Sequence, residues 1–264
     1  MEENVYIDDN SLIMSDFTWS FSRLNSYYTC PYSAKLQYLD CIKGEDNFFG
    51  QFGTLCHKLL ERYYMGELTL FELSDEYEHI FSDIVTCDAP RHKTADIGRG
   101  YYDAGLEYFN NFEGLPDFEI VSVEEKIRFE IKEHKFITIP DLIVRNKGKR
   151  LEIIDHKSED LKKPTRQFTK VSDKFDEKIR QLYLNSYAVN LRYGELPEFL
   201  NFNIFRKNNW IKHPFNMDEY NETIKWALDT INIYKKETEW KPKSDYYFCN
   251  NICNFRNGIC EFKG

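Results

Sequence analysis

Hydrophobic and polar residues follow two different periods along this chain, and the change falls near residue 118. Before that point apolar residues recur every three or four positions, which is the period of amphipathic helices. After it they alternate with polar residues, which is the period of half-buried strands, and helical periods return further on. The pattern predicts helices at about residues 20–30, 32–39, 50–64, 70–84, 95–112, 181–189 and 217–238, and strands at 118–131, 137–145, 151–158 and 200–206.

Two of the predicted strands, 137–145 and 151–158, are separated by Asn-Lys-Gly-Lys and therefore predict a β-hairpin. Ionisable residues interrupt both apolar runs: Asp141 in the first, and Asp155 and Lys157 in the second. Because residues two apart on a strand share a face, Asp155 and Lys157 point the same way. Two carboxylates and a lysine on a buried sheet face are costly unless a metal and a reaction need them. The hairpin is therefore predicted to carry a metal-dependent catalytic site.

The register of this hairpin decides whether the two aspartates can share a metal. A symmetric turn of two or four residues places Asp141 and Asp155 on opposite faces, whereas an odd loop or a bulge brings them to one face. Gly148 suits the left-handed position of a three-residue loop, and Pro140 suits a bulge or the start of a strand. We expect one of these two features.

The composition is that of a chain with a full hydrophobic core and an acidic total charge. Its 264 residues are 42% hydrophobic, enough for a single domain over residues 1–264 with a helical insertion at 66–115. The formal net charge of −9 argues against non-specific coating of nucleic acid or anionic membranes, but it allows a local basic groove. No signal-peptide pattern and no apolar run of about 20 residues is present, so we expect a soluble cytoplasmic protein that does not bind membranes.

One predicted helix carries a further candidate metal ligand. Within residues 50–64, His57 and Glu61 are four residues apart and share a helix face with Gly53. Because glycine has no side chain, the position one turn before His57 leaves space for another group to approach.

A segment rich in lysine and arginine follows the hairpin, at residues 159–180. It either forms a solvated face or follows nucleic-acid phosphates beside the hairpin. Its cations are Lys162, Lys163, Arg166, Lys170, Lys174, Lys178 and Arg180.

Seven cysteines are too few for a disulfide scaffold in a chain of this length. Three of them form a C-x3-C-x6-C cluster: Cys249, Cys253 and Cys260. Three thiolates need a fourth ligand to complete a four-coordinate site, and Cys30 is the best candidate. Such a site would join residues 16–40 to residues 240–264. Cysteines hold both iron–sulfur clusters and zinc, so residue type alone leaves both open.

Together these motifs resemble the RecB-family branch of the PD-(D/E)xK nuclease superfamily. Within that branch the chain is similar to the iron–sulfur members, namely the AddB nuclease domain and the CRISPR-adaptation exonucleases. The resemblance covers nearly the whole chain. It rests on the Ser-x-Ser-x-Leu opening before Cys30-Pro31, the Gly53-x-x-x-His57-x-x-x-Glu61 helix, Asp141, Asp155-x-Lys157, Gln181 and the terminal cysteines.

The resemblance implies an α/β fold with a restriction-endonuclease-like core, in which helices flank a mixed central β-sheet. It implies a Mg²⁺ or Mn²⁺ site whose ligands are His57, Asp141, Asp155 and the backbone carbonyl of His156. It implies that Lys157 orients or activates the attacking water and that Gln181 belongs to the same catalytic set. It also implies that a [4Fe–4S] cluster, with zinc as the alternative, is held by Cys30, Cys249, Cys253 and Cys260.

Two positions depart from the family's pattern. The family has glycine three residues before its first aspartate, where this chain has Thr138. The family's later helix reads Gln-x-x-x-Tyr, and here Asn185 stands at the tyrosine position, between Tyr183 and Tyr187. Gln181 therefore carries over directly, whereas the tyrosine has no direct counterpart.

The residues and the resemblance predict the same mechanism. A bound divalent ion neutralises a phosphodiester oxygen and lowers the pKa of a water, while Lys157 stabilises the developing charge. We expect Lys157→Ala and Asp155→Ala each to abolish hydrolysis with the fold intact. The predicted function is a metal-dependent DNA exonuclease acting on single-stranded ends in recombination or repair, CRISPR adaptation or phage DNA processing.

The same resemblance implies binding partners and leaves two alternative functions open. The partner would be single-stranded DNA together with a helicase, recombination or integrase protein, and the sequence leaves homo-oligomerisation open. The alternative function is a non-catalytic iron–sulfur module that binds DNA ends for a helicase or an integrase. An RNA nuclease is a weaker alternative, because nothing in the sequence reads a 2′-hydroxyl.

Overall fold

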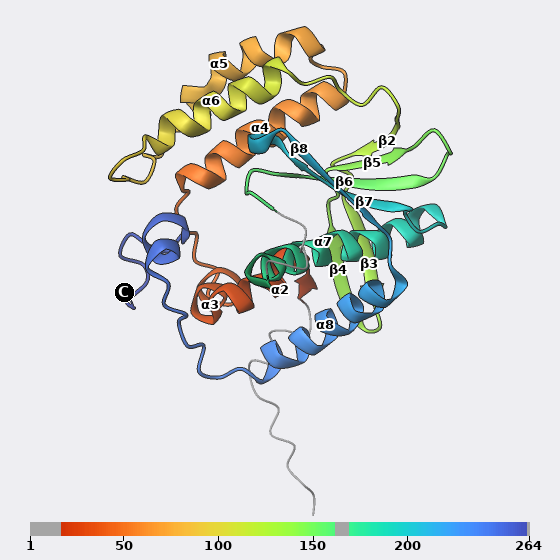
Figure 1. The fold of residues 1–264 in the computed structure, drawn as a ribbon. Helices are drawn as coiled ribbons and strands as arrows, with labels where there is room; N and C mark the ends of the chain where they lie inside the picture. Colours follow the sequence, from red (N-terminus) through yellow and green to blue (C-terminus); the bar gives the residue numbers. More distant parts are fainter. Residues whose placement is uncertain (1–16, 162–168, 263–264) are drawn as a thin grey trace, which may run out of the picture.

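The computed structural model describes residues 17–161 and 169–262 and shows a mixed α/β fold (Figure 1). The first part is helical and contains β1 (Thr18–Trp19), α2 (Phe21–Thr29), α3 (Pro31–Tyr38), α4 (Phe48–Tyr64), the 3-10 turn η1 (Leu70–Glu72), α5 (Leu73–Ile84) and α6 (Ile97–Asn110). The strands that follow are β2 (Glu119–Val123), β3 (Ile127–Ile131), β4 (His134–Thr138), β5 (Leu142–Arg145), β6 (Leu151–Lys157), β7 (Phe199–Ile204) and β8 (Asn209–Pro214). Between and after them lie α7 (Thr169–Tyr193), the 3-10 turn η2 (Phe205–Lys207), α8 (Met217–Lys236) and the π-helical turn η3 (Phe248–Ile252).

The strands form two sheets. The larger sheet has the order β2-β5-β6-β7-β8, in which β6 and β7 are parallel and the other neighbours are antiparallel. The smaller sheet has the order β1-β4-β3, with β1 parallel to β4. The predicted mixed sheet flanked by helices is therefore confirmed. Strand β8 was not predicted, because it is an edge strand with only Ile211 buried and shows no clear alternation.

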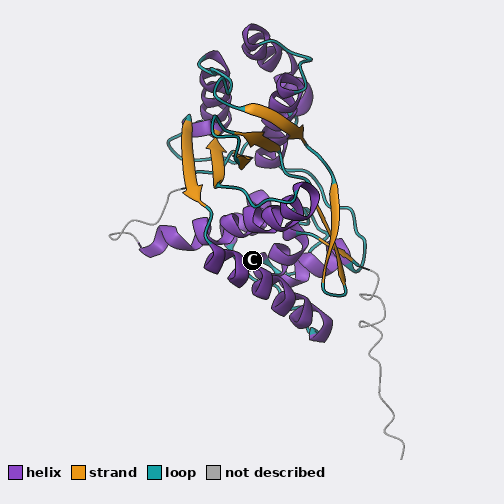
Figure 2. Cartoon of the chain, turned by 90° about the vertical axis from the view of Figure 1, so that its right-hand side faces the viewer, coloured by secondary structure: helices purple, strands orange, loops and turns teal. Residues whose placement is uncertain are grey.

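Helices cover the larger sheet on both sides (Figures 1 and 2). On one side α7 and α8 enclose the main core, whose sheet residues include Ile153 and Phe202. On the other side α4, α5 and α6 pack on one another around Phe52 and Tyr77, so the helices expected between residues 68 and 115 are present. None of the helices in the described parts of the chain is long and apolar enough to cross a membrane.

The predicted hairpin is correct in its loop and wrong in its first strand. Residues 137–145 are not one strand: β4 ends at Thr138, and β5 begins at Leu142 in the other sheet. Pro140 lies in the break, where its missing N–H cannot join a ladder.

The hairpin loop has the predicted three residues. The Asn146 N–H donates to the Arg150 carbonyl at 3.0 Å, and the Lys149 N–H donates to the Asn146 carbonyl at 2.8 Å. The left-handed residue is Lys149, with φ 63°, and not Gly148 as predicted. A Cβ at Gly148 would lie 3.2 Å from the Asn146 side-chain oxygen, a tight contact that favours glycine there. The odd loop pairs Leu142 with Ile154.

Candidate active site

A cleft runs along one face of α4, and the predicted metal ligand His57 lines it. Phe49, Gly53, His57 and Glu61 line it at successive intervals of four residues, which places them on one side of the helix. Glu124 and Ser158 line the cleft as well. The opposite, apolar face of α4 is buried in the helical layer, so the sequence pattern fixes which side chains face the cleft.

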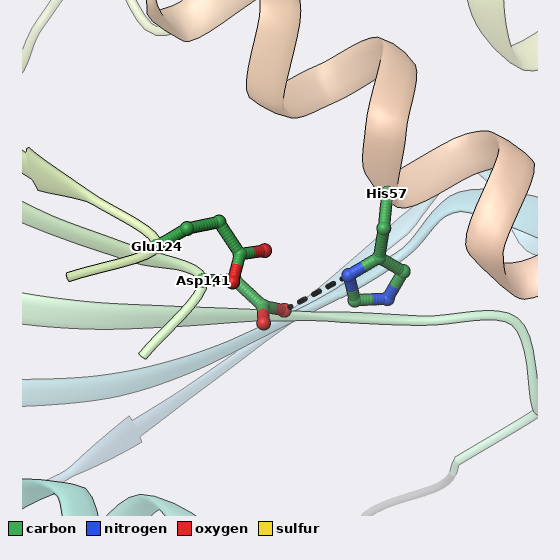
Figure 3. Close-up of side chains that lie close together, drawn as sticks. All are labelled: His57, Glu124 and Asp141. Carbon is green, nitrogen blue, oxygen red and sulfur yellow. Dashed lines mark ion pairs between the residues drawn. The ribbon is translucent and has the colours of Figure 1, made fainter. Parts of the chain in front are cut away.

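His57 is held by two neighbours. Its Nε2 lies 2.9 Å from the backbone carbonyl of His156, and its Nδ1 lies 3.6 Å from Asp141 Oδ2 (Figure 3). A carbonyl only accepts hydrogen bonds, so this contact requires the proton on Nε2 and leaves the Nδ1 lone pair directed at the carboxylate. Nδ1 is therefore the nitrogen available to a cation.

Asp141 lies at the entry to β5 and faces the other strand of the hairpin. The register of the odd loop places it opposite Asp155, one position beyond the Leu142–Ile154 pair. Its Oδ2 accepts a hydrogen bond of 2.6 Å from the His156 N–H. Burial raises the pKa of Asp141 to about 6, and the neighbouring Asp155 adds to this, while His57 opposes it. The two aspartates are thus close enough to repel each other.

Asp155, Lys157 and Gln181 form a second group beside Asp141. Asp155 is buried, and its Oδ2 lies 2.6 Å from Lys157 Nζ. The same ammonium donates to Gln181 Oε1 of α7 at 3.0 Å. Burial alone lowers the pKa of Lys157, but Asp155 and Asp141 outweigh it and the pKa is raised. Lys157 is therefore a charged ammonium in a fixed position.

Glu124 belongs to the site but was not singled out from the sequence. Its carboxylate, His57 and Asp141 each offer a ligand atom, and these atoms all lie within 4.8 Å of one another (Figure 3). We call these three residues the ligand triad. Burial raises the pKa of Glu124 to about 8, and Asp141, Glu61 and Asp155 contribute in that order.

The local conformation explains why Glu124 was missed. In the sequence Glu124 belongs to the alternating run at 118–131, but in the structure it directly follows β2 with a φ of 47°. Its N–H donates to the Asp141 carbonyl at 3.1 Å. A left-handed glutamate has no sequence signature. The available signal was an acid in a turn between two strands that precede Asp141.

The triad has the chemistry of a hard-cation site. One imidazole and two carboxylates suit Mg²⁺ or Mn²⁺. The raised pKa values of both carboxyl groups reflect burial first and repulsion by neighbouring acids second, and a dication would favour the charged form of both. The His156 N–H orients Asp141 as an outer hydrogen-bond donor. Of the predicted ligands, His57 and Asp141 are brought together, the His156 carbonyl contacts His57, and Asp155 is paired with Lys157.

All four predicted cluster cysteines line one cavity. Cys30 and Cys253 are buried, and Cys249 and Cys260 are partly exposed. The Lys243 N–H points at Cys30 Sγ at 3.4 Å. Within the described residues, these cysteines are absent from the groups of three ligand atoms that lie within 4.8 Å of one another.

The two departures from the family's pattern contact each other. The Thr138 hydroxyl donates to the Asn185 side-chain oxygen. Of the flanking tyrosines, Tyr183 donates to Glu219 at 2.9 Å, and Tyr187 packs on the ring of Phe129. Both tyrosines thus serve packing between α7 and its neighbours.

The basic segment is described only in part. Lys178 pairs with Glu159 at 3.0 Å, and the Arg180 guanidinium lies 5.0 Å from the centre of the Trp226 ring. Lys174 is exposed. The predicted cations Lys162, Lys163, Arg166 and Lys170 fall outside the residues or side chains that the structure describes.

Comparison with known proteins identifies the family. The family model described as "PD-(D/E)XK nuclease superfamily" matches residues 18–260. Among solved structures, a "Putative exonuclease" from Eubacterium rectale is similar with a TM-score of 0.48 and 13% identity, over 99% of this chain and 94% of that one. The protein SSO0001 is similar with a TM-score of 0.34 and 15% identity, over 92% of this chain and 99% of that one. No curated protein matches the chain.

Proposed function

Because the chain belongs to the PD-(D/E)XK nuclease superfamily, we propose that it is a metal-dependent DNA exonuclease acting on single-stranded ends. One observation carries the proposal: the ligand triad, of which His57 and Glu124 line the cleft, lies next to the buried pair of Asp155 and Lys157. A cation site beside a fixed ammonium can neutralise the charge that develops when a phosphodiester is hydrolysed.

The triad would hold Mg²⁺ or Mn²⁺, and the nitrogen ligand His57 favours Mn²⁺ over Mg²⁺. The bound ion would supply charge neutralisation at the phosphate and a water of lowered pKa. The Lys157 ammonium, fixed between Asp155 and Gln181, contributes positive charge to the pentacovalent phosphate. The His156 N–H keeps Asp141 Oδ2 in place throughout.

The test is release of nucleotides from single-stranded oligonucleotides labelled at the 5′ or the 3′ end. We expect release with Mn²⁺, none with EDTA, and at least a thousandfold loss for Asp141→Asn. The two labels together report the direction of digestion. Binding without release would mean a non-catalytic DNA-end module, and equal activity of Asp141→Asn would remove the proposed site. Faster digestion of RNA would reassign the substrate.

We infer further that Cys30, Cys249, Cys253 and Cys260 hold a [4Fe–4S] cluster. Their common cavity supports a single shared group. In tetrahedral zinc sites, sulfurs about 2.3 Å from the metal lie only about 3.8 Å apart. Any three of these thiols include at least one pair more than 4.8 Å apart, which suits a larger cluster better.

Protein purified without oxygen should be brown, with about four irons and four sulfides per chain. Cys253→Ser should lose this colour, whereas Cys41→Ser, at an exposed thiol outside the cavity, should keep it. Colourless protein with one zinc per chain would replace the iron–sulfur assignment by a zinc site.

The biological setting that fits such an activity is DNA-end processing. We propose recombination or repair, CRISPR adaptation or phage DNA processing, with a helicase, recombination or integrase protein as partner. Co-purification from cells with one of these partners would distinguish the three.

A further inference from the structure

Three aromatic rings from separate segments meet around Phe49, which lines the active-site cleft. Phe49 comes from the first turn of α4, Tyr101 from α6, and Tyr247 from the segment just before η3. The centre of the Phe49 ring lies 5.3 Å from that of Tyr101 and 6.5 Å from that of Tyr247. Tyr247 is 52% exposed, and the other two are half-buried. We call these three residues the aromatic platform.

A cation connects the platform to the catalytic strand. The Arg206 guanidinium lies 4.6 Å from the centre of the Tyr101 ring, within range of a cation–π interaction. Its Nε donates to the Ser158 carbonyl at 3.0 Å. Ser158 follows Lys157 directly and lines the cleft. Arg206 is thus fixed between the rings and the end of β6.

One residue of the platform, Phe49, and two of the ligand triad, His57 and Glu124, line the same cleft. Phe49, Gly53 and His57 lie on the same face of α4, and all three line the cleft with Glu124. Phe49 and His57 are eight residues apart, or about 12 Å along the helix. A stacked strand with about 3.4 Å per nucleotide covers that distance in three to four nucleotides.

The floor between the platform and the triad is open. A Cβ added at Gly53 would have only the Ser158 hydroxyl within 4 Å, at 3.8 Å, so no protein group fills the space in front of this glycine. The absence of a side chain at Gly53 therefore leaves a path along α4 for a ligand.

The platform is also rigidly anchored. Asn47 caps α4 by accepting from the Gly50 N–H at 2.9 Å, and its amide donates to the Ile252 carbonyl at 2.9 Å. One side chain thus fixes both the start of the helix that carries Phe49 and the segment that carries Tyr247. Rings held in place before binding lose little entropy when a base stacks on them.

We propose that the aromatic platform stacks unpaired bases of single-stranded DNA, three to four nucleotides from the phosphate that the triad and Lys157 act on. This inference rests on the proposed nuclease function and names the form of its substrate. Rings accept any base face, whereas bases inside a duplex are already stacked and paired. The platform therefore selects single strands without selecting sequence.

The test is equilibrium binding of labelled oligothymidylates of about two to ten nucleotides, with Ca²⁺ in place of Mn²⁺ to prevent hydrolysis. For the wild-type protein we expect affinity to rise steeply once the strand exceeds about four nucleotides. Tyr247→Leu and Phe49→Leu should each weaken binding of the longer strands roughly tenfold, the loss of one stacked base. Tyr247→Phe should stay within about twofold. Phe71→Leu is the matched control, because Phe71 is 87% exposed beyond the other end of α4.

Equal affinity of Tyr247→Leu, Phe49→Leu and wild type for long single strands would overturn the proposal. So would equal binding of duplex and single strands with the same loss in both, or no binding of any oligonucleotide. A failure of the nuclease function is separately visible as absent Mn²⁺-dependent nucleotide release, which this binding assay does not use.

Discussion

Replacing Glu124 by glutamine should raise the thermal stability of the metal-free protein and should reduce the stabilisation that Mn²⁺ provides. The metal-free site contains carboxyl groups that repel one another, and Glu124 carries a pKa of about 8 instead of 4.5. Because the pKa of Glu124 is higher in the folded chain than in the unfolded chain, the folded chain binds more protons between about pH 4.5 and pH 8. The stabilising effect of the protonated group is present below about pH 4.5 and is lost as the pH rises through 8. Glutamine keeps the protonated group's shape and neutrality at every pH.

The magnitude follows from the same shift. At about 1.4 kcal/mol per pKa unit, the full change corresponds to about 5 kcal/mol. Glu124 is only half-buried, so solvent screening reduces this to about 2 kcal/mol. In a chain of this size, such a gain raises Tm by about 4 °C. Glu124→Gln without divalent ions should therefore melt about 4 °C above wild type at pH 8.5 and at the same temperature at pH 5.

Mn²⁺ should stabilise the wild-type protein more than Glu124→Gln. The ion stabilises whichever chain binds it, and glutamine lacks the charge of the lost ligand. An at least tenfold weaker Kd removes about 1.4 kcal/mol of that stabilisation. Thermal unfolding at both pH values, with and without Mn²⁺, measures both effects, and Glu130→Gln on the exposed side of β3 controls for net charge.

Two results would refute this reasoning. A metal-free Glu124→Gln variant no more stable than wild type at pH 8.5 would show that burial and the neighbouring acids do not destabilise the charged form of Glu124. A Tm increase with Mn²⁺ equal to that of wild type would show that Glu124 does not bind the ion.

Three further predictions concern the surroundings of the triad. Lys157→Ala should abolish hydrolysis. It should also lower the free energy of unfolding by about 3 kcal/mol, because Asp155 becomes an unpaired buried carboxylate. Nucleotide release measures the first loss and thermal melting curves measure the second. Gly53→Leu should stabilise α4 by roughly 1 kcal/mol in helix propensity yet reduce single-strand digestion at least tenfold by filling the cleft, which Tm and nucleotide release would show together. Asn47→Asp keeps the helix cap but loses the amide donor to Ile252, so it should weaken single-strand binding while the helix content by circular dichroism is unchanged.

Each of these predictions has a contradicting outcome. Normal hydrolysis by Lys157→Ala would remove the ammonium from the chemistry, and unchanged stability would mean that Asp155 is not effectively buried. Full digestion by Gly53→Leu would place the DNA path elsewhere. For Asn47→Asp, loss of helix content equal to that of Asn47→Ala would show that the cap had failed and that the contact with Ile252 was not isolated.

The sequence predicted the parts of the site that lie in regular local patterns. The apolar run interrupted by Asp155 and Lys157 identified β6. The apolar stripe of α4 identified, on the other side of that helix, the face that carries His57. The loop length also followed from the sequence, but the choice of its left-handed residue did not. Lys149 takes that conformation, and Gly148 lies where the Asn146 side chain approaches.

The tertiary structure added the contacts between residues that are far apart in the chain. Glu124 reaches His57 only because a left-handed turn at the end of β2 is hydrogen-bonded to Asp141. The aromatic platform joins three segments that share no local pattern.

The sequence by itself determined the helix and strand periods, the order of the acidic and basic residues, and the spacing of the terminal cysteines, because each depends on near neighbours along the chain. Only tertiary packing decided that Glu124 completes the ligand triad with His57 and Asp141, and that Tyr247 lies against Phe49. Such contacts depend on how whole elements pack, and packing is set by the shape of the core and not by any local run of residues.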